Sequence, residues 1–342
     1  MKKIRTVLVG LGTVNLGLLN ILIEKKDLIL QNHNLEVCIV GVADSSGMAI
    51  KDEGYSYTEI IQLKSHGEKV SHLAGHLPGV AVEKIANHVD AELLVDGSPV
   101  NLKTGQPGLQ AIQLALELGW NVVSANKAPL VLAFNELHAR AKKHGGQLAY
   151  SAAVCGGLPV INVLRRDLHV TNLKGLKGIF NATSNFILNE LEKGGSFEEA
   201  VKEAQRIGAA EADPSLDIDG YDTSNKLYII MKSFTNFSGS VNDIKVNGIR
   251  QMTSEKLKEA SLRGKRIKLL AEAHRNGEGW NLSVQPTEVD SSSFLATCVG
   301  WEMGLQLQTD YYEELYLKIY EEDPISTCAA VVRDIINISE AL

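Results

Sequence analysis

The sequence predicts an α/β protein with two domains, the first built on a doubly wound parallel sheet. Its length of 342 residues exceeds what a single hydrophobic core usually serves. In the first half, short β-branched runs alternate with helical patterns, as in a parallel sheet covered by helices on both faces, and a glycine-rich turn follows the first run directly. We expect the first domain at residues 1–150, completed by residues 326–342, and an α+β domain with an open sheet at residues 151–325.

The composition is that of an acidic globular protein. There are 34 basic and 41 acidic residues, a net charge of −7, and 44% hydrophobic residues. The basic residues form no long run, which argues against nucleic acid as a partner, and no apolar run approaches the roughly 20 residues of a membrane span. The N-terminus leads into a strand instead of a signal peptide, and the cysteines are scattered, without a CxxC pair, which argues against zinc or disulfides and fits a reducing compartment. We therefore expect a cytoplasmic protein without a membrane or nucleic-acid partner.

The glycine-rich turn predicts a nucleotide-binding loop. The run at residues 4–9 reads as a strand, and a helical pattern begins within a few residues of it. Gly10 allows the tight turn, and Gly12 lets backbone amides approach a pyrophosphate at the helix N-terminus. Asn15 stands where a third glycine is usual and Gly17 comes two residues later, so the helix is expected to pack differently. The predicted cofactor contacts of this turn are Gly10, Gly12, Thr13 and Val14.

Asp44 ends the second predicted strand and bears on the choice of cofactor. An acid at this position accepts hydrogen bonds from an adenosine ribose and repels a 2′-phosphate, so NAD is favoured. NADP remains open because Lys51 is near in the sequence. The alternative is that Asp44 is a solvated turn residue.

Two further strands, at residues 93–97 and 121–124, continue the Rossmann-type pattern, with a helix at residues 108–118 between them. Ligands of such sheets bind beyond the carboxyl ends of the strands. Lys127 follows the second of these strands and is expected to point into that crevice; the alternative is a surface lysine before a helix. The residues predicted at these strand ends are Ser98, Ala125, Asn126 and Lys127.

The second half contains a polar cluster that opens a helix. A strand at residues 176–180 is followed by Asn181, Thr183 and Asn185, whose amides and hydroxyl suit a carboxylate or an amino-acid backbone. Capping of the helix by Thr183 or Ser184 is the alternative, and the two interpretations are compatible.

An acidic block closed by one lysine is the most informative feature of the sequence. Asp222 and Lys226 are four residues apart, so they share one helical face. The helix is apolar on every side from Leu227 to Met231 and should be buried, and a buried helix seldom carries a lysine without a partner or a task. The alternative is a weak surface ion pair. The acids of the block are Glu211, Asp213, Asp217, Asp219 and Asp222.

Taken together, these motifs resemble the homoserine dehydrogenase family over roughly residues 1–340. The matching motifs are Gly10-Leu-Gly12-Thr-Val, Ser124-Ala-Asn-Lys127, Gly156-Gly-Leu-Pro159, Gly178-Ile-Phe-Asn181-Ala-Thr183-Ser-Asn185, and Glu211 through Lys226. The resemblance implies reversible, NAD(P)-dependent hydride transfer between L-homoserine and L-aspartate 4-semialdehyde, in amino-acid biosynthesis. It also implies a homodimer paired through the open sheet, and a short form without the C-terminal regulatory domain of some relatives.

The resemblance also assigns roles to residues. Lys226 is the proton donor, Asp222 holds it and engages the substrate, and Lys127 lies beside the nicotinamide and the reacting carbon. The residues implied in substrate binding are Glu211, Asp217, Thr183 and Gly157. A helix starting near Thr327 touches the cofactor, although residues 321–324 replace the family's glycine-rich turn before it.

A monovalent cation is implied at the backbone carbonyls of Val154 and Gly156, but Ser151 stands where the family often has a glutamate that helps to hold it. The cation is therefore left open. Two other functions also stay open on the sequence: another NAD(P)-dependent dehydrogenase of small amino or oxo acids, and a catalytically silent nucleotide sensor on the same fold.

Overall fold

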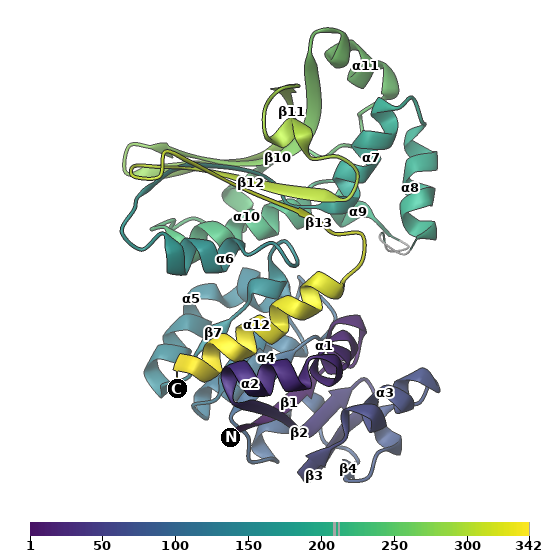
Figure 1. Ribbon diagram of the computed structural model, residues 1–342, viewed down its shortest axis with the longest axis vertical. Coiled ribbons are helices and arrows are strands. Elements are labelled where there is room, and N and C mark those ends of the chain that lie inside the picture. Colours follow the sequence, from purple (N-terminus) through teal and green to yellow (C-terminus); the bar gives the residue numbers. More distant parts are fainter. Residues whose placement is uncertain (208–209, 211–212, 342) are drawn as a thin grey trace. The chain divides into compact units, whose positions relative to one another are not determined.

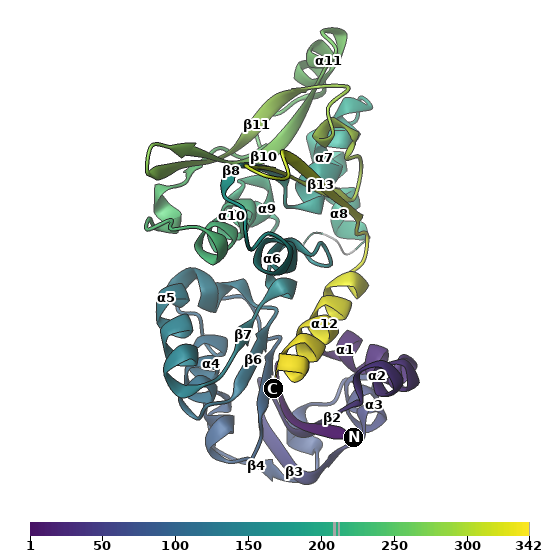
Figure 2. The ribbon, with the colours of Figure 1, turned by 60° about the vertical axis from the view of Figure 1, so that its left-hand side comes forward.

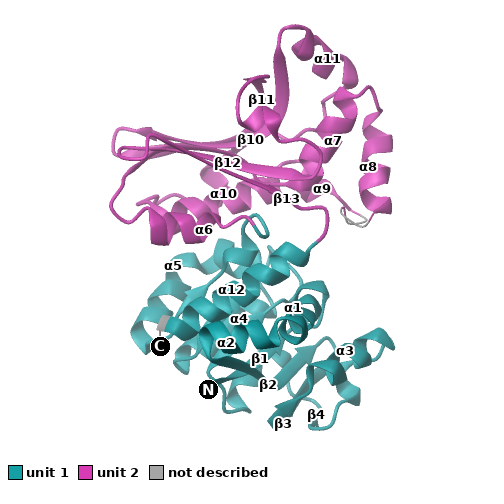
Figure 3. Ribbon diagram, in the orientation of Figure 1, with its two compact units in different colours: residues 1–157, 324–342 teal, residues 158–323 magenta. Residues whose placement is uncertain are grey.

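The computed structural model describes residues 1–207, 210 and 213–341. The chain divides into two compact units (Figure 3). One comprises Met1–Gly157 and Pro324–Leu342, and the other comprises Leu158–Asp323. Among the helices of the described residues, none combines the length and the apolarity needed to cross a lipid bilayer.

The first unit contains a sheet of seven strands within the described residues, in the order β4-β3-β2-β1-β5-β6-β7. Strands β2, β1, β5, β6 and β7 are parallel, whereas β3 and β4 are antiparallel to their neighbours. The predicted doubly wound α/β fold is confirmed, and the antiparallel pair extends one edge of it. The strands are β1 (Lys2–Val9), β2 (Leu35–Asp44), β3 (Gly47–Tyr55), β4 (His76–Leu77), β5 (Leu93–Asp96), β6 (Asn121–Ser124) and β7 (Leu148–Ala149).

Helices cover both faces of this sheet, with α4 and α5 on one face and α1 and α12 on the other (Figure 2). Although α12 lies at the far end of the sequence, its Val331 and Ile335 share one apolar core with Leu18 and Leu22 of α1. The C-terminal helix is therefore part of the first unit. The helices are α1 (Thr13–Glu24), α2 (Lys26–His33), α3 (Tyr57–Ser65), α4 (Gly108–Glu117), α5 (Lys127–His144) and α12 (Ile325–Ala341), with short turns at Val70–His72, Val82–Asn87 and Ser151–Ala153.

The second unit is the predicted α+β domain. Its described residues form a sheet in the order β13-β12-β8-β10-β11-β9, antiparallel except for the pair β9–β11, and α7 and α10 lie along one face of it (Figure 1). The strands are β8 (Leu173–Ile179), β9 (Lys245–Val246), β10 (Lys265–Asn276), β11 (Gly279–Asp290), β12 (Glu302–Thr309) and β13 (Glu314–Tyr320). The helices are α6 (Val160–Asn162), α7 (Ala182–Glu192), α8 (Phe197–Arg206), α9 (Ser215–Ile218), α10 (Tyr221–Phe234) and α11 (Ser254–Leu262), with short turns at Val163–Asp167, Val241–Asp243 and Leu295–Thr297.

Candidate functional site

The glycine turn lies where the sheet of the first unit reverses its strand order, between β1 and β5. Gly10 has a φ of +81°, and a Cβ there would lie 2.5 Å from the carbonyl oxygen of Gly97, so only glycine fits. A Cβ at Gly12 would meet nothing within 4 Å, so the space before α1 is open. The first turn of α1, including Thr13 and Val14, has no side-chain cap and no acid. Its backbone amides therefore fit the phosphate of a nucleotide.

The predicted Thr327 lies in the first turn of α12. The neighbouring Cys328 contacts the carbonyl of Thr13 through its sulfur at 3.8 Å. A Cβ on Gly17 would collide with the same sulfur. Gly17 thus allows α1 and α12 to pack closely, and this contact brings Thr327 toward the start of α1.

Asp44 is at the end of β2, and its carboxylate is engaged by the loop that follows. One oxygen accepts hydrogen bonds from the backbone amide and the hydroxyl of Ser46, at 2.8 and 2.6 Å. The other accepts from Lys64 and from the amide of Val70, both at 3.2 Å. Partial burial raises the pKa of Asp44, but these hydrogen bonds outweigh it and keep the pKa below its usual value. The side chain is 10% exposed, and its predicted contact with a ribose stays a prediction.

The tips of β5 and β6 carry a buried polar network around Asp96. One oxygen of Asp96 accepts from the amide and the hydroxyl of Ser98, at 3.0 and 2.6 Å, and the other accepts from Ser124 at 3.2 Å. Asn126 donates to the Ser98 hydroxyl at 3.1 Å and caps α5. Burial raises the pKa of Asp96 to about 6, against the opposing effect of these hydrogen bonds.

This network places several predicted residues together and adds one that was missed. Ser98, Ala125, Asn126 and Lys127 all follow the carboxyl ends of neighbouring strands. Asp96 was missed because the sequence predicts only a strand at residues 93–97, although an acid directly after buried residues is itself a signal of a functional or structural role. It fixes the loops that carry the predicted cofactor contacts.

The turn before the second unit contains the residues implied in cation binding. Ser151 donates through its amide and hydroxyl to the buried carboxylate of Asp334, at 2.7 and 2.8 Å. Cys155 and Gly156 both have a φ of +56°. Among the described residues, no group of three or more His, Cys, Asp or Glu side chains is placed to hold a metal ion. Cation binding by the carbonyls of Val154 and Gly156 stays a prediction, as does the role of Gly157.

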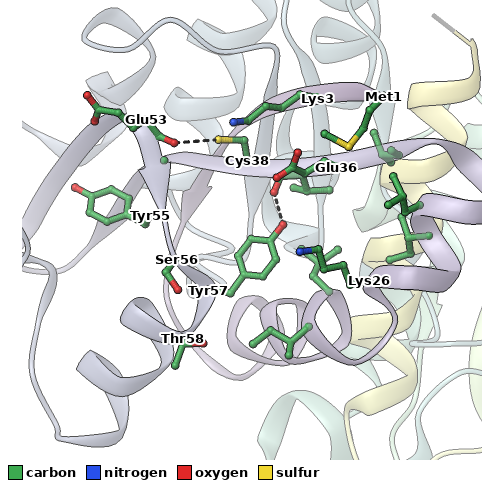
Figure 4. A pocket seen from close by; sticks show the side chains of 17 residues that line it. Met1, Lys3, Lys26, Glu36, Cys38, Glu53, Tyr55, Ser56, Tyr57 and Thr58 are labelled. Atoms are coloured by element: carbon green, nitrogen blue, oxygen red, sulfur yellow. Dashed lines mark hydrogen bonds between the residues drawn. The ribbon is translucent and has the colours of Figure 1, made fainter.

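A cavity of about 660 Å³ in the first unit lies away from these residues (Figure 4). Lys3 and Glu36 line it from the amino ends of β1 and β2, and Tyr57 borders it with its hydroxyl bonded to the carbonyl of Val37. Nucleotides bind at the carboxyl ends of parallel strands. This cavity is at the opposite ends and contains none of the predicted site residues.

In the second unit, the predicted lysine–carboxylate pair is formed on a buried helix. Lys226 lies 2.8 Å from Asp222, and their side chains are 15% and 5% exposed. The Lys226 ammonium also donates to the carbonyl oxygen of Phe180 at 2.7 Å. The apolar stretch Leu227–Met231 is buried, which confirms the predicted environment of α10 and excludes a weak surface pair.

Asn181 of the predicted polar cluster binds two carboxylates of the protein itself. Its amide nitrogen donates to Asp217 of α9 at 2.6 Å and to Asp222 of α10 at 2.9 Å. Thr183 is buried in the first turn of α7. Glu211 lies outside the described residues. The structure therefore brings together Asp217, Asp222 and Lys226 around the end of β8.

Two expectations about the polar cluster at the start of α7 are corrected. The cap of α7 is Asn181, whose oxygen accepts from the amide of Ser184, so capping by Thr183 or Ser184 is wrong. Asn185 does not contribute to a substrate site, because its amide donates to the carbonyls of Gly300 and Glu302 and its oxygen accepts from the buried Lys268.

A doubly wound sheet with an open glycine turn at its switch point, together with a buried lysine–carboxylate pair, is typical of nicotinamide-dependent oxidoreductases. The family model described as homoserine dehydrogenase matches residues 159–336. The homoserine dehydrogenase of Methanocaldococcus jannaschii is 34% identical over 97% of each chain. A protein of Pseudomonas canavaninivorans named NAD(+)-dependent homoserine dehydrogenase is 28% identical over 100% of this chain and 97% of its own.

Among solved structures, a putative homoserine dehydrogenase from Archaeoglobus fulgidus superposes with a TM-score of 0.87 at 31% identity. The match covers 98% of this chain and 99% of that one. The chain belongs to the homoserine dehydrogenase family, a family of NAD(P)-dependent oxidoreductases, and the predicted resemblance is confirmed.

Proposed function

We propose that this chain catalyses reversible hydride transfer between L-homoserine and L-aspartate 4-semialdehyde, with NAD(P) as the cofactor. The observation that carries the proposal, beside family membership, is the buried Asp222–Lys226 pair held at the end of β8. The cofactor supplies the hydride. The protein must supply a proton and stabilise the charge that grows on the aldehyde oxygen.

Lys226 is the proton donor in this proposal. Two acceptors, the carboxylate of Asp222 and the carbonyl of Phe180, hold its ammonium in one place. Both favour the charged form, which can stabilise an alkoxide and protonate it. In the oxidative direction the neutral amine takes up the proton. The residues proposed to bind the polar end of the substrate are Glu211, Asp217, Thr183 and Gly157.

The cofactor is proposed to bind at the carboxyl ends of β1, β5 and β6. The open amides at Gly12 support a diphosphate there. Lys127, at the start of α5, is assigned to the nicotinamide and the reacting carbon. The further contacts are Gly10, Thr13, Val14, Asp44, Ser98, Ala125, Asn126 and Thr327. NAD is preferred because Asp44 would repel a 2′-phosphate, and one relative is named NAD(+)-dependent.

A homodimer in the cytoplasm completes the proposal. β13 is an edge strand with alternating exposed residues. Four exposed tyrosines lie on it or just before it: Tyr311, Tyr312, Tyr316 and Tyr320. Aromatic surface of this kind is enriched at interfaces, so a second copy is a fitting occupant. Light scattering of the purified protein measures the assembly.

The test of the reaction is the absorbance of reduced nicotinamide during oxidation of L-homoserine, with NAD⁺ and NADP⁺ supplied separately. Alkaline pH is chosen because the oxidation releases a proton. Lys226→Met should lose the rate and keep its affinity for NAD. Lys232→Met is the matched control, because it makes the same change in the last turn of the same helix. Measurable NAD binding without any rate on homoserine would exclude this substrate.

A further inference from the structure

The orientation of the Asn181 amide is fixed by its neighbours. The backbone amide of Ser184 can only donate, so the atom 2.7 Å from it must be the side-chain oxygen of Asn181. The two carboxylates on the other side accept hydrogen bonds, so they must face the amide nitrogen. The cap of α7 thus aims both N–H groups of Asn181 at Asp217 and Asp222.

This arrangement brings two carboxylates to a single nitrogen. An oxygen of Asp217 lies 2.6 Å and an oxygen of Asp222 lies 2.9 Å from it. The distance between these two carboxylate oxygens therefore cannot exceed the sum of the two hydrogen-bond lengths. Two carboxylates this close oppose each other's ionisation. The neutral amide of Asn181 between them stabilises both negative charges and leaves Lys226 paired with Asp222.

The same oxygen of Asp222 that accepts from Asn181 also lies 2.8 Å from the Lys226 ammonium. Phe180, the residue before Asn181, provides the carbonyl that holds the other side of the ammonium. Two consecutive residues at the end of β8 therefore fix the carboxylate and the lysine. Because Phe180 and Asn181 are neighbours in the chain, the backbone between them fixes the position of the Lys226 ammonium relative to the Asp222 carboxylate.

We propose that Asn181 is a positioning residue for the reaction. It sets the place and direction of the Lys226 ammonium through Asp222, and it keeps Asp217 and Asp222 charged for the substrate. This inference rests on the proposed function. It does not make Asn181 a group that reacts with the substrate.

Two substitutions separate this role from that of the helix cap. Serine and aspartate cap helices about as well as asparagine, so Asn181→Ser and Asn181→Asp both keep the cap. Serine removes the donors to the carboxylates, and aspartate replaces them with a third negative charge. The measurements are kcat and KM for homoserine, the Kd for NAD⁺, the thermal midpoint, and the kinetic isotope effect on kcat with homoserine deuterated at the carbinol carbon.

For Asn181→Ser we expect kcat to fall by about 10–100-fold, because a small misplacement of a reacting group has effects of this size. For Asn181→Asp we expect kcat to fall by at least the same factor. In both variants the isotope effect should increase because hydride transfer becomes slower, and the Kd for NAD⁺ should stay within about twofold. Wild-type kcat and isotope effect in the two variants would overturn the inference. If one variant does not fold, the other decides by the same criteria. A wild-type protein inactive on homoserine would instead refute the proposed function.

Discussion

Replacing Lys226 with methionine should have two separate effects, one on turnover and one on stability. Methionine keeps much of the volume and removes the charge. Loss of a general acid lowers turnover by about 10²–10⁴-fold. The Asp222 carboxylate, 5% exposed, would lose its cation, and breaking a buried pair costs about 3–5 kcal/mol. Since Asn181 still donates to Asp222, we expect a loss near 3 kcal/mol in the free energy of unfolding.

A double variant distinguishes the two effects. Asp222→Asn with Lys226→Met replaces the whole pair by neutral groups, which is often close to neutral for stability. It should recover most of the lost free energy of unfolding in urea and none of the turnover. Lys232→Met should match the wild type in both measurements. The reasoning is refuted if Lys226→Met keeps wild-type turnover, or if the double variant is as unstable as the single one.

Four further predictions concern the first unit. Gly10→Ala should lower the thermal midpoint and NAD binding, since its φ of +81° and the nearby Gly97 carbonyl exclude a side chain. Gly12→Ala, at a φ of −93° with nothing within 4 Å of the new Cβ, should weaken NAD binding and leave the thermal midpoint unchanged. A fall in the thermal midpoint of Gly12→Ala as large as that of Gly10→Ala would contradict this prediction. Asp44→Ser should raise the ratio of kcat/KM for NADP⁺ over NAD⁺ by about tenfold or more; an unchanged ratio would restrict Asp44 to its loop contacts. The pKa of Asp96 is raised from 3.8 to about 6, so the folded state binds the extra proton between these values, and the group's contribution to stability falls as pH rises through this window. The stability advantage of the wild type over Asp96→Asn should therefore be about 2 kcal/mol larger at pH 4.5 than at pH 7.5, and urea unfolding at both values measures it.

The sequence was informative where one physical cause dominates a segment. The buried parallel strands and the helix around Lys226 were predicted because a continuous apolar run is stable only where it is buried on all sides. β3 was not predicted. It lies next to the edge strand β4, and its exposed residues Asp52 and Glu53 interrupt the apolar pattern. In the segment that follows β3, Ile60, Leu63 and Val70 belong to the main core.

The partners of two polar residues in the candidate sites could not be predicted, for a different reason. Asn181 and Asp96 act by hydrogen bonds to residues from other elements, at Asp217, Asp222 and Ser124. Such bonds depend on how strands and helices meet in space. A single sequence shows the donor and acceptor types but not which of them face each other.

Asn15 shows how a departure from a linear motif can preserve its three-dimensional purpose. The third glycine of a nucleotide-binding turn normally lets the helix approach the sheet closely. Here Asn15 is fully buried and donates to the carbonyls of Val9 and Gly10, at 3.2 and 2.6 Å. Its amide occupies the space that a Cβ of Gly97 would need. The glycine that permits the close approach is thus Gly97, at the tip of β5, instead of a residue of the helix. Gly97 is more than 80 positions away from Asn15 in the sequence. Since the amide also ties the helix to the end of β1, the turn gains hydrogen bonds that a glycine could not make.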